Sequence, residues 1–228
     1  MNSPMKSPLA GRPRTQELIN KDGRLSAFRV RPRELTPLGA KLADAVSSIL
    51  GVGMVVASVA TLPDWRHPAL PELAVAIGAT VAGIWMLRII AREAFRVNTR
   101  IDLDLESIRV RRLRGWERFD RRLEHRFALL PHDGAERERR RNELATREAS
   151  ANGHVVQKPV YYGDSFHVVL VYAGHRVDLL SVYGRKQAAS IVARLQYCDQ
   201  MLEQEAKRVG ARTNPHVGAE WHDSPGGI

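Results

Sequence analysis

The sequence predicts a membrane-anchored α+β protein, in which a two-helix transmembrane hairpin precedes an antiparallel β domain with a C-terminal amphipathic helix. Three observations predict this class. Residues 45–62 and 73–87 contain no charged side chain, and such long apolar segments are typical of membrane helices. From Ile101 onward, apolar and charged residues alternate, which indicates strands with one buried face. Residues 188–202 then carry apolar side chains at helical spacing.

The segment before the first apolar stretch, residues 1–41, is expected to be a flexible basic arm. It holds nine of the 35 basic residues and five prolines but few large apolar side chains, so it offers little surface for a core. Its polar start lacks the apolar stretch of a cleavable signal peptide. We therefore expect the first membrane helix to be an uncleaved anchor.

Two membrane helices are predicted, at about 42–62 and 70–91. Each has apolar side chains around its whole circumference, and a helix of about 20 residues covers the roughly 30 Å hydrocarbon core. Burial in a soluble core is disfavoured, because a chain of 228 residues has no further layer to cover both helices. The short connection 63–69 predicts an antiparallel hairpin. Small residues at four-residue spacing favour close packing within this hairpin, and a homo-oligomer that uses them is the less favoured alternative.

Basic residues predict the orientation of the hairpin. Nine Lys or Arg precede the first helix, and several arginines between 88 and 100 close the second, whereas the connection 63–69 contains only Arg66. By the positive-inside rule, both termini face the cytoplasm and the connection lies on the outer side.

One acidic and one basic side chain lie near the cytoplasmic ends of the predicted membrane helices. Asp44 begins the first helix and Arg88 is near the end of the second, so both lie at a similar depth in an antiparallel hairpin. They are a candidate intramembrane ion pair. The slightly favoured alternative is that Arg88 extends alone to the headgroups, which avoids most of the cost of burying its charge.

The predicted cytoplasmic domain covers 94–209. A charged insertion at 134–150 is expected to be either a solvated helix or a mobile segment. An amphipathic helix at 185–208 is expected to cover the sheet, and residues 210–228 are expected to be a disordered tail. The predicted strands are 101–105, 108–110, the stretches around Phe119 and 127–130, and then 155–162, 166–172 and 175–182.

The order of these elements resembles that of a known family. Two stretches carry the resemblance, TRIDLDLESIRVRRL at 99–113 and FHVVLVYAGHRVDLLSVYGRKQAASIVARL at 166–195. They are similar to the bacterial membrane proteins in which a transmembrane hairpin is joined to a pleckstrin-homology-like (PH-like) domain, over about residues 94–206. The resemblance implies a PH-like fold, a multi-pass location in the bacterial inner membrane and a non-enzymatic binding or scaffolding role. It supplies no functional residues.

The sequence lacks the common motifs of catalysis. It contains no G-x-x-x-x-G-K-[ST], no G-x-G-x-x-G and no G-x-S-x-G. Its histidines do not have the spacing of a helical zinc pair. The single cysteine, Cys198, excludes an intramolecular disulfide and a cysteine-based zinc finger. We therefore expect no enzymatic activity, no cofactor and no metal.

An arginine-rich run, residues 109–122, is the candidate contact for an anionic partner. Aromatic side chains interrupt its arginines, as in many nucleic-acid-binding surfaces, while two acidic residues dilute its charge. A solvated strand face is the favoured interpretation, a contact with anionic lipid headgroups or an acidic protein comes second, and nucleic acid comes last. The candidate contact residues are Arg109, Arg111, Arg112, Arg114, Trp116, Arg118, Arg121 and Arg122.

The leading hypothesis for function is a scaffold or accessory subunit of the inner membrane. In this hypothesis the cytoplasmic domain binds a protein partner, within an envelope or secretion assembly, and the lipid bilayer holds the hairpin. The alternative is a membrane-tethered protein that binds nucleic acid or anionic lipid through its arginine-rich surface.

Overall fold

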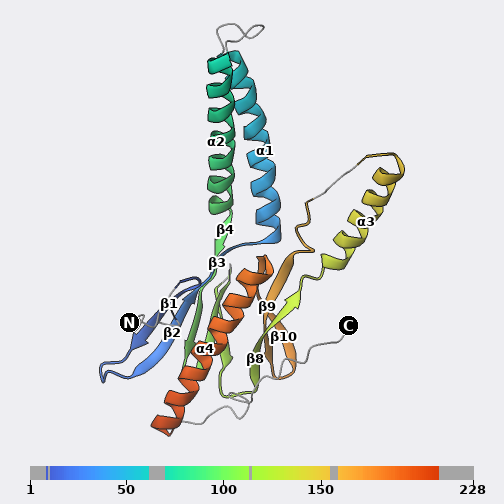
Figure 1. Cartoon of the computed structure of the whole chain (residues 1–228). Helices are drawn as coiled ribbons and strands as arrows, with labels where there is room; N and C mark the ends of the chain where they lie inside the picture. The colour runs from blue at the N-terminus through green and yellow to red at the C-terminus, as the bar shows by residue number, and fades with distance from the viewer. Residues whose placement is uncertain (1–8, 10, 62–69, 113–114, 155–158, 211–228) are drawn as a thin grey trace, which may run out of the picture. The chain divides into compact units, whose positions relative to one another are not determined.

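The computed structural model divides the chain into two compact units (Figure 1). It describes residue 9 and residues 11–61, 70–112, 115–154 and 159–210. The first unit combines Met1–Arg33, Asn98–His132 and Phe166–Ile228, and the second combines Glu34–Val97 and Asp133–Ser165. Each unit is therefore assembled from segments that are distant in the sequence.

A five-stranded antiparallel sheet forms one half of the first unit. Its order is β1-β2-β5-β6-β7, so β1 and β7 are its edge strands. Apolar residues alternate with charged ones along the strands, and the apolar ones face the core. The strands are β1 (Arg14–Ile19), β2 (Leu25–Arg31), β5 (Ile101–Asp104), β6 (Ser107–Arg112) and β7 (Gly115–Asp120).

A second sheet of three strands has the order β10-β9-β8. These strands are β8 (His125–Pro131), β9 (Ser165–Tyr172) and β10 (His175–Tyr183). The β9–β10 turn has Ala173 at φ 47° and Gly174 at φ 80°. Two consecutive positive φ angles match the twist of a two-residue hairpin, as the Ala-Gly sequence predicts.

Helix α4 (Arg185–Val209) packs against strands of both sheets. Its apolar stripe supplies Ile191, Leu195 and Leu202 to the core, where all three are fully buried. Gly210 ends the helix in the left-handed conformation that favours glycine. The predicted amphipathic helix is therefore present, with its stripe on the sheets.

The prediction of a flexible basic arm over 1–41 is wrong for residues 14–35. Strand β2 is an inner strand of the larger sheet, paired with β1 on one side and β5 on the other. Its residues Phe28 and Val30 are 1% and 0% exposed. Arg194 of α4 also holds this segment, donating hydrogen bonds to the carbonyl of Leu9 (2.7 Å) and the hydroxyl of Thr15 (2.9 Å). Residues 1–8 and 10 lie outside the described residues.

The domain boundaries 94–209 are wrong for the same reason. The first unit begins before the helical hairpin, so the hairpin interrupts it instead of preceding it. Residues 133–165 group with the hairpin in the second unit. The predicted tail lies outside the described residues from residue 211 onward.

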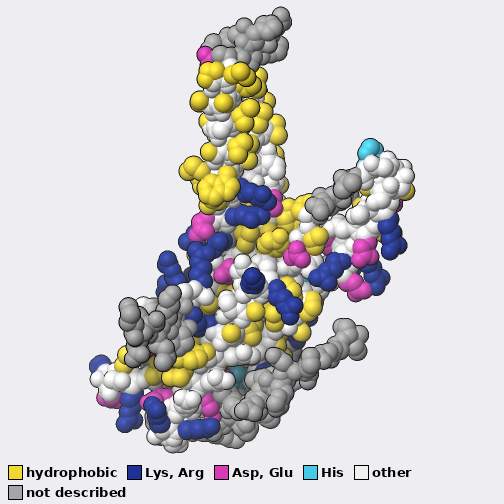
Figure 2. All heavy atoms as spheres, in the orientation of Figure 1, with side chains coloured by type: hydrophobic (Ala, Val, Ile, Leu, Met, Phe, Trp, Pro, Cys, Tyr) yellow, Lys and Arg dark blue, Asp and Glu magenta, His cyan; other side chains and the backbone are white. Residues whose placement is uncertain are grey.

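Helices α1 (Pro37–Ala60) and α2 (Leu70–Ala94) pack along each other in the second unit. The Thr36 hydroxyl accepts a hydrogen bond from the Gly39 amide (3.0 Å), which starts α1 five residues earlier than predicted. Both helices are long and apolar enough to cross a membrane. Figure 2 shows hydrophobic side chains over their exposed surface. Strands β3 (Arg33–Leu35) and β4 (Arg96–Asn98) pair at the chain ends of this hairpin.

Close packing within the hairpin involves its small residues. A Cβ atom on Gly51 would lie 3.6 Å from Ile84, and one on Gly83 would collide with Met54. The hydroxyls of Ser58 and Thr80 lie 2.7 Å apart and hydrogen-bond the two helices. The predicted intramolecular use of small residues thus holds for Gly51, whereas a Cβ atom on Gly53 or Gly78 would meet no atom within 4 Å.

The charged insertion is a helix, α3 (Ala135–Ala151). Most of its side chains are exposed, in keeping with the solvated-helix alternative. The strand predicted at 155–162 is absent from 159–162, the part of it that the structure describes. There the chain instead follows α3 closely, because Arg139 donates to the carbonyl of Gly163 and Glu138 accepts from its amide, both at 2.7 Å.

Candidate functional site

The outer face of the five-stranded sheet is strongly basic. Strand alternation buries Val30, Ile101 and Val110 in the core and places their neighbours on the opposite face. Register aligns these neighbours in rows, such as Arg29, Asp102, Arg109 and Arg118 across four strands. We name this surface the basic sheet face. Its members are Arg14, Arg29, Arg31, Arg100, Arg109, Arg111, Trp116 and Arg118.

Asp102 orients two arginines of this face. Its carboxylate is 6% exposed and accepts from Arg29 Nε (3.3 Å) and Arg100 Nη2 (2.7 Å). The hydrogen bond to this carboxylate raises the pKa of Arg100 above its ordinary value. The Arg100 guanidinium also lies 5.0 Å from the Trp116 ring centroid, a cation–π contact. These contacts fix part of the surface before any partner binds.

Four arginines of the basic sheet face have no acidic partner in the part of the chain that the structure describes. Arg109, in contrast, pairs with Asp104 at 3.3 Å. Among the described residues, no ion pair is formed by the exposed side chains of Arg14, Arg31, Arg111 and Arg118. With seven arginines against Asp102, Asp104 and Asp120, which shares the parity of Arg118 in β7, the face has a positive excess.

Strand geometry divides the predicted run 109–122 into residues that could meet a partner and residues that cannot. Arg109, Arg111, Trp116 and Arg118 lie on the basic sheet face, and Trp116 is 46% exposed. Arg112 points to the other side, where its guanidinium donates to the carbonyls of Leu179 and Asp178 in β10. It therefore joins the two sheets.

Two further arginines of the predicted run, Arg121 and Arg122, do not belong to that face. Arg122 follows the end of β7 and pairs with Glu106 at 2.6 Å. Arg114 lies outside the described residues. Arg121 is buried, 2% exposed, and its assignment as a partner contact is wrong.

Arg121 instead forms a buried ion cluster with α4. Its Nε lies 2.6 Å from Asp199 Oδ1 and its Nη2 lies 3.4 Å from Glu203 Oε2. His125 Nε2 lies 3.3 Å from the same oxygen of Asp199. Burial raises the pKa of Asp199, but the hydrogen bond with His125 and the charge of Arg121 outweigh it and hold that pKa below its usual range. The cluster joins α4 to the turn after β7.

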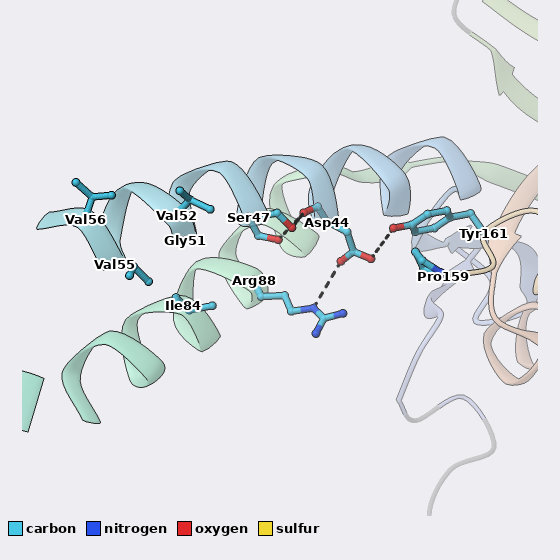
Figure 3. A pocket seen from close by; sticks show the side chains of 11 residues that line it. Asp44, Ser47, Gly51, Val52, Val55, Val56, Ile84, Arg88, Pro159 and Tyr161 are labelled. Atoms are coloured by element: carbon cyan, nitrogen blue, oxygen red, sulfur yellow. Dashed lines mark hydrogen bonds and ion pairs between the residues drawn. The ribbon is translucent and has the colours of Figure 1, made fainter. Parts of the chain in front are cut away.

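A second polar cluster lies at the start of α1, in the second unit (Figure 3). The Asp44 carboxylate lies 3.6 Å from Arg88 Nε and 3.2 Å from Arg92 Nη2. The Tyr161 hydroxyl donates to its other oxygen at 3.2 Å. The structure thus brings Asp44 and Arg88 together, and it adds Arg92 and Tyr161 to the pair.

Several members of these sites were missed in the sequence. Arg14, Arg29 and Arg31 were assigned to the flexible arm, although the alternation Phe28-Arg29-Val30-Arg31 is itself a strand signal. No local sequence pattern indicates that Tyr161 belongs to the cluster, because its contact with Asp44 joins residues 117 positions apart.

Metal ligands and the thiol were also considered within the residues that the structure describes. In the described part of the chain, no group of three or more His, Cys, Asp or Glu side chains could hold a metal ion. Cys198 is buried in the core, and this burial raises the pKa of its thiol to about 12. The thiol is therefore protonated and unreactive in the folded unit.

No protein-family model, no curated protein and no solved structure matches the chain. The class of protein therefore follows from the fold and its surfaces. The chain is an α+β protein with antiparallel sheets and two helices that are long and apolar enough to cross a membrane.

Proposed function

We propose that the chain is a non-enzymatic, membrane-anchored scaffold or accessory subunit that binds an acidic segment of a partner protein through the basic sheet face. In this proposal α1 and α2 span the bacterial inner membrane and both termini are cytoplasmic. The first unit is a PH-like domain, since it has two antiparallel sheets and a C-terminal helix packed against both. An envelope or secretion assembly is the setting that fits these features.

The observation that carries the proposal is the set of arginines that have no acidic partner among the described residues. Arg14, Arg31, Arg111 and Arg118 are exposed on one regular surface. Arginine presents several donors in a rigid planar fork that matches a carboxylate in bidentate geometry. A surface that only served solubility would have both signs of charge interspersed.

The position of Trp116 and Arg118 at a sheet edge favours a protein segment over other anions. Trp116 and Arg118 belong to β7, an edge strand of the sheet. An edge strand offers unpaired backbone donors and acceptors to an extended peptide, while side chains beside it select the sequence. Lipid headgroups and nucleic-acid phosphates make no use of such an edge. They are alternative outcomes of the test.

The test is site-specific crosslinking in native membranes. With p-benzoylphenylalanine in place of Trp116 in the full chain, we expect ultraviolet light to yield a discrete protein adduct. The double substitution Arg111→Glu and Arg118→Glu should reduce this adduct at least about ten-fold, because it reverses the charge that attracts the partner. The adduct is quantified by immunoblot and identified by mass spectrometry.

A matched control reverses two charges elsewhere. Arg137 and Arg141 are exposed on α3, and their replacement by Glu should leave the adduct unchanged. An adduct that disappears on nuclease treatment would assign the surface to nucleic acid, and an adduct with a lipid mass would assign it to headgroups. Either result, or a protein adduct equally strong in both double variants, would contradict the proposal.

A further inference from the structure

A groove runs along α1 from the polar cluster at Asp44 toward the middle of the helix (Figure 3). Its free volume of about 590 Å³ lies within the range of pockets that hold small molecules, roughly 300–1,000 Å³. Asp44, Arg88 and Tyr161 line one end, and apolar side chains line the other. The apolar lining consists of Gly51, Val52, Val55, Val56 and Ile84.

The polar end of the groove has a positive excess. Asp44 is the acidic residue of the cluster, and it faces both Arg88 and Arg92. Lys41 is exposed one turn before Asp44 and shares its face of α1, because it lies three residues earlier. The two arginines outnumber the one carboxylate that they contact, and Lys41 adds positive charge on the same helix face, which favours an anionic ligand.

Arg88 has donors left for such a ligand. Asp44 meets its Nε atom, and Figure 3 shows the rest of the guanidinium extending beyond this contact into the space beside Tyr161. The Arg88 side chain is 56% exposed, so these donors are accessible. The hydroxyls of Ser47 and Ser48 are not expected to bind the anion, because both already donate to the Asp44 carbonyl, at 3.0 Å and 2.7 Å.

The apolar end matches the depth of one membrane leaflet. From Asp44 to Val55 the helix rises about 16 Å, which is close to half of the roughly 30 Å hydrocarbon core. Neither a free anion nor a soluble peptide would need an apolar strip of this length directly below a basic cluster.

We infer that this groove binds one anionic phospholipid of the surrounding bilayer, with its phosphate on Arg88 and an acyl chain along Val52 and Val55. The inference rests on the membrane-spanning part of the proposed function and is independent of the basic sheet face. The site selects anionic over zwitterionic lipids. In a zwitterionic headgroup the cationic group offsets the charge of the phosphate, so the basic excess of the site attracts that headgroup less.

Photolabelling of the full chain in phosphatidylcholine nanodiscs tests the inference. Phosphatidylglycerol or phosphatidylcholine with a diazirine on one acyl chain is added as the probe, and labelled peptides are mapped by mass spectrometry. We expect phosphatidylglycerol to label residues 47–56 preferentially, and unlabelled phosphatidylglycerol to compete. Arg88→Gln should reduce the preference over phosphatidylcholine about five-fold.

A second substitution blocks the groove without touching its charges. Val52→Trp should reduce labelling of 47–56 by either lipid, whereas Ile49→Trp, at an exposed apolar residue outside the lining, should leave it unchanged. Equal labelling by the two lipids, an unchanged preference in Arg88→Gln or no effect of Val52→Trp would overturn the inference. So would competition by inorganic phosphate, which would indicate a site for the free anion. Absence of all labelling on α1 and α2 would instead show that the helices are not in the bilayer, a failure of the proposed membrane anchoring.

Discussion

At the scale of single residues, two adjacent arginines have opposite roles. Arg121 and Arg122 are adjacent, yet one is buried against two carboxylates and the other pairs with Glu106 at the surface. The turn after β7 directs the two side chains differently, because Arg121 reaches Asp199 and Glu203 of α4 whereas Arg122 reaches Glu106. Removing the buried cation would leave Asp199 and Glu203 without their positive partner.

This difference predicts unequal costs for the same substitution. Arg121→Met should lower the free energy of unfolding by about 3–5 kcal/mol, since it leaves buried carboxylates uncompensated. Arg122→Met, the matched control, should change it by about 0–1 kcal/mol. The measurement is the urea dependence of iodoacetamide labelling at Cys198, whose buried thiol reacts only after unfolding. Equal costs for the two variants would contradict the buried ion cluster.

At the scale of elements, sequence alone predicted those with a strong local period. Helices α1, α2 and α4 and strands β5, β9 and β10 lie close to their expected positions, because each has a continuous apolar or alternating pattern. Strands β1 and β2 were missed because their prolines and arginines suggested a tail. Strand β2 pairs with β5, which lies about 70 residues further along the chain, and no local pattern identifies a pairing at that distance.

The candidate sites, too, could be predicted only where a local pattern indicates them. Alternation alone could have separated Arg112 and Arg121 from Arg109, Arg111 and Arg118, because the two groups have opposite parity across the β6–β7 hairpin. The arginines that β1 and β2 add to the basic sheet face depended on long-range pairing. The pairing of Asp44 with Arg88 followed from depth in an antiparallel hairpin, which is a property of the predicted element.

The start of helix α1 makes a further prediction at this scale. A Cβ atom on Gly39 would lie 2.9 Å from the Phe95 carbonyl and 3.0 Å from the capping hydroxyl of Thr36. Gly39→Ala should therefore destabilise the hairpin by about 1–3 kcal/mol through overpacking.

Gly53, also in α1, supplies the matched control, because no atom lies within 4 Å of a Cβ at that position. Gly53→Ala should be neutral or stabilising, because alanine favours a helix. Thermal unfolding in detergent, followed by circular dichroism, compares the two variants. Equal melting temperatures would contradict the close contact of Gly39 with Phe95 and Thr36.

At the scale of the whole molecule, the first unit is interrupted twice. The chain leaves it after β2 and returns at β5, and these strands pair through Val30 and Ile101. It leaves again after β8 and returns at β9, which pair through Pro131 and Phe166. Each excursion therefore starts and ends at neighbouring points of a sheet. Both excursions together form the second unit.

This topology predicts that the first unit folds without the second. A shortened chain with residues 34–97 and 133–165 each replaced by an Asn-Gly turn should be soluble and should protect Cys198 from iodoacetamide, because α4 and the strands of the five-stranded and three-stranded sheets keep their partners. The amide of Thr99 already donates to the carbonyl of Pro32 at 3.1 Å, so a short connection fits there. The continuous fragment 94–209 should fail the same assay, because without β2 it lacks Phe28 and Val30 and exposes the edge of β5. Cooperative unfolding and full protection of Cys198 in that fragment would show that β1 and β2 are dispensable, and this would contradict the prediction that the first unit needs them to fold.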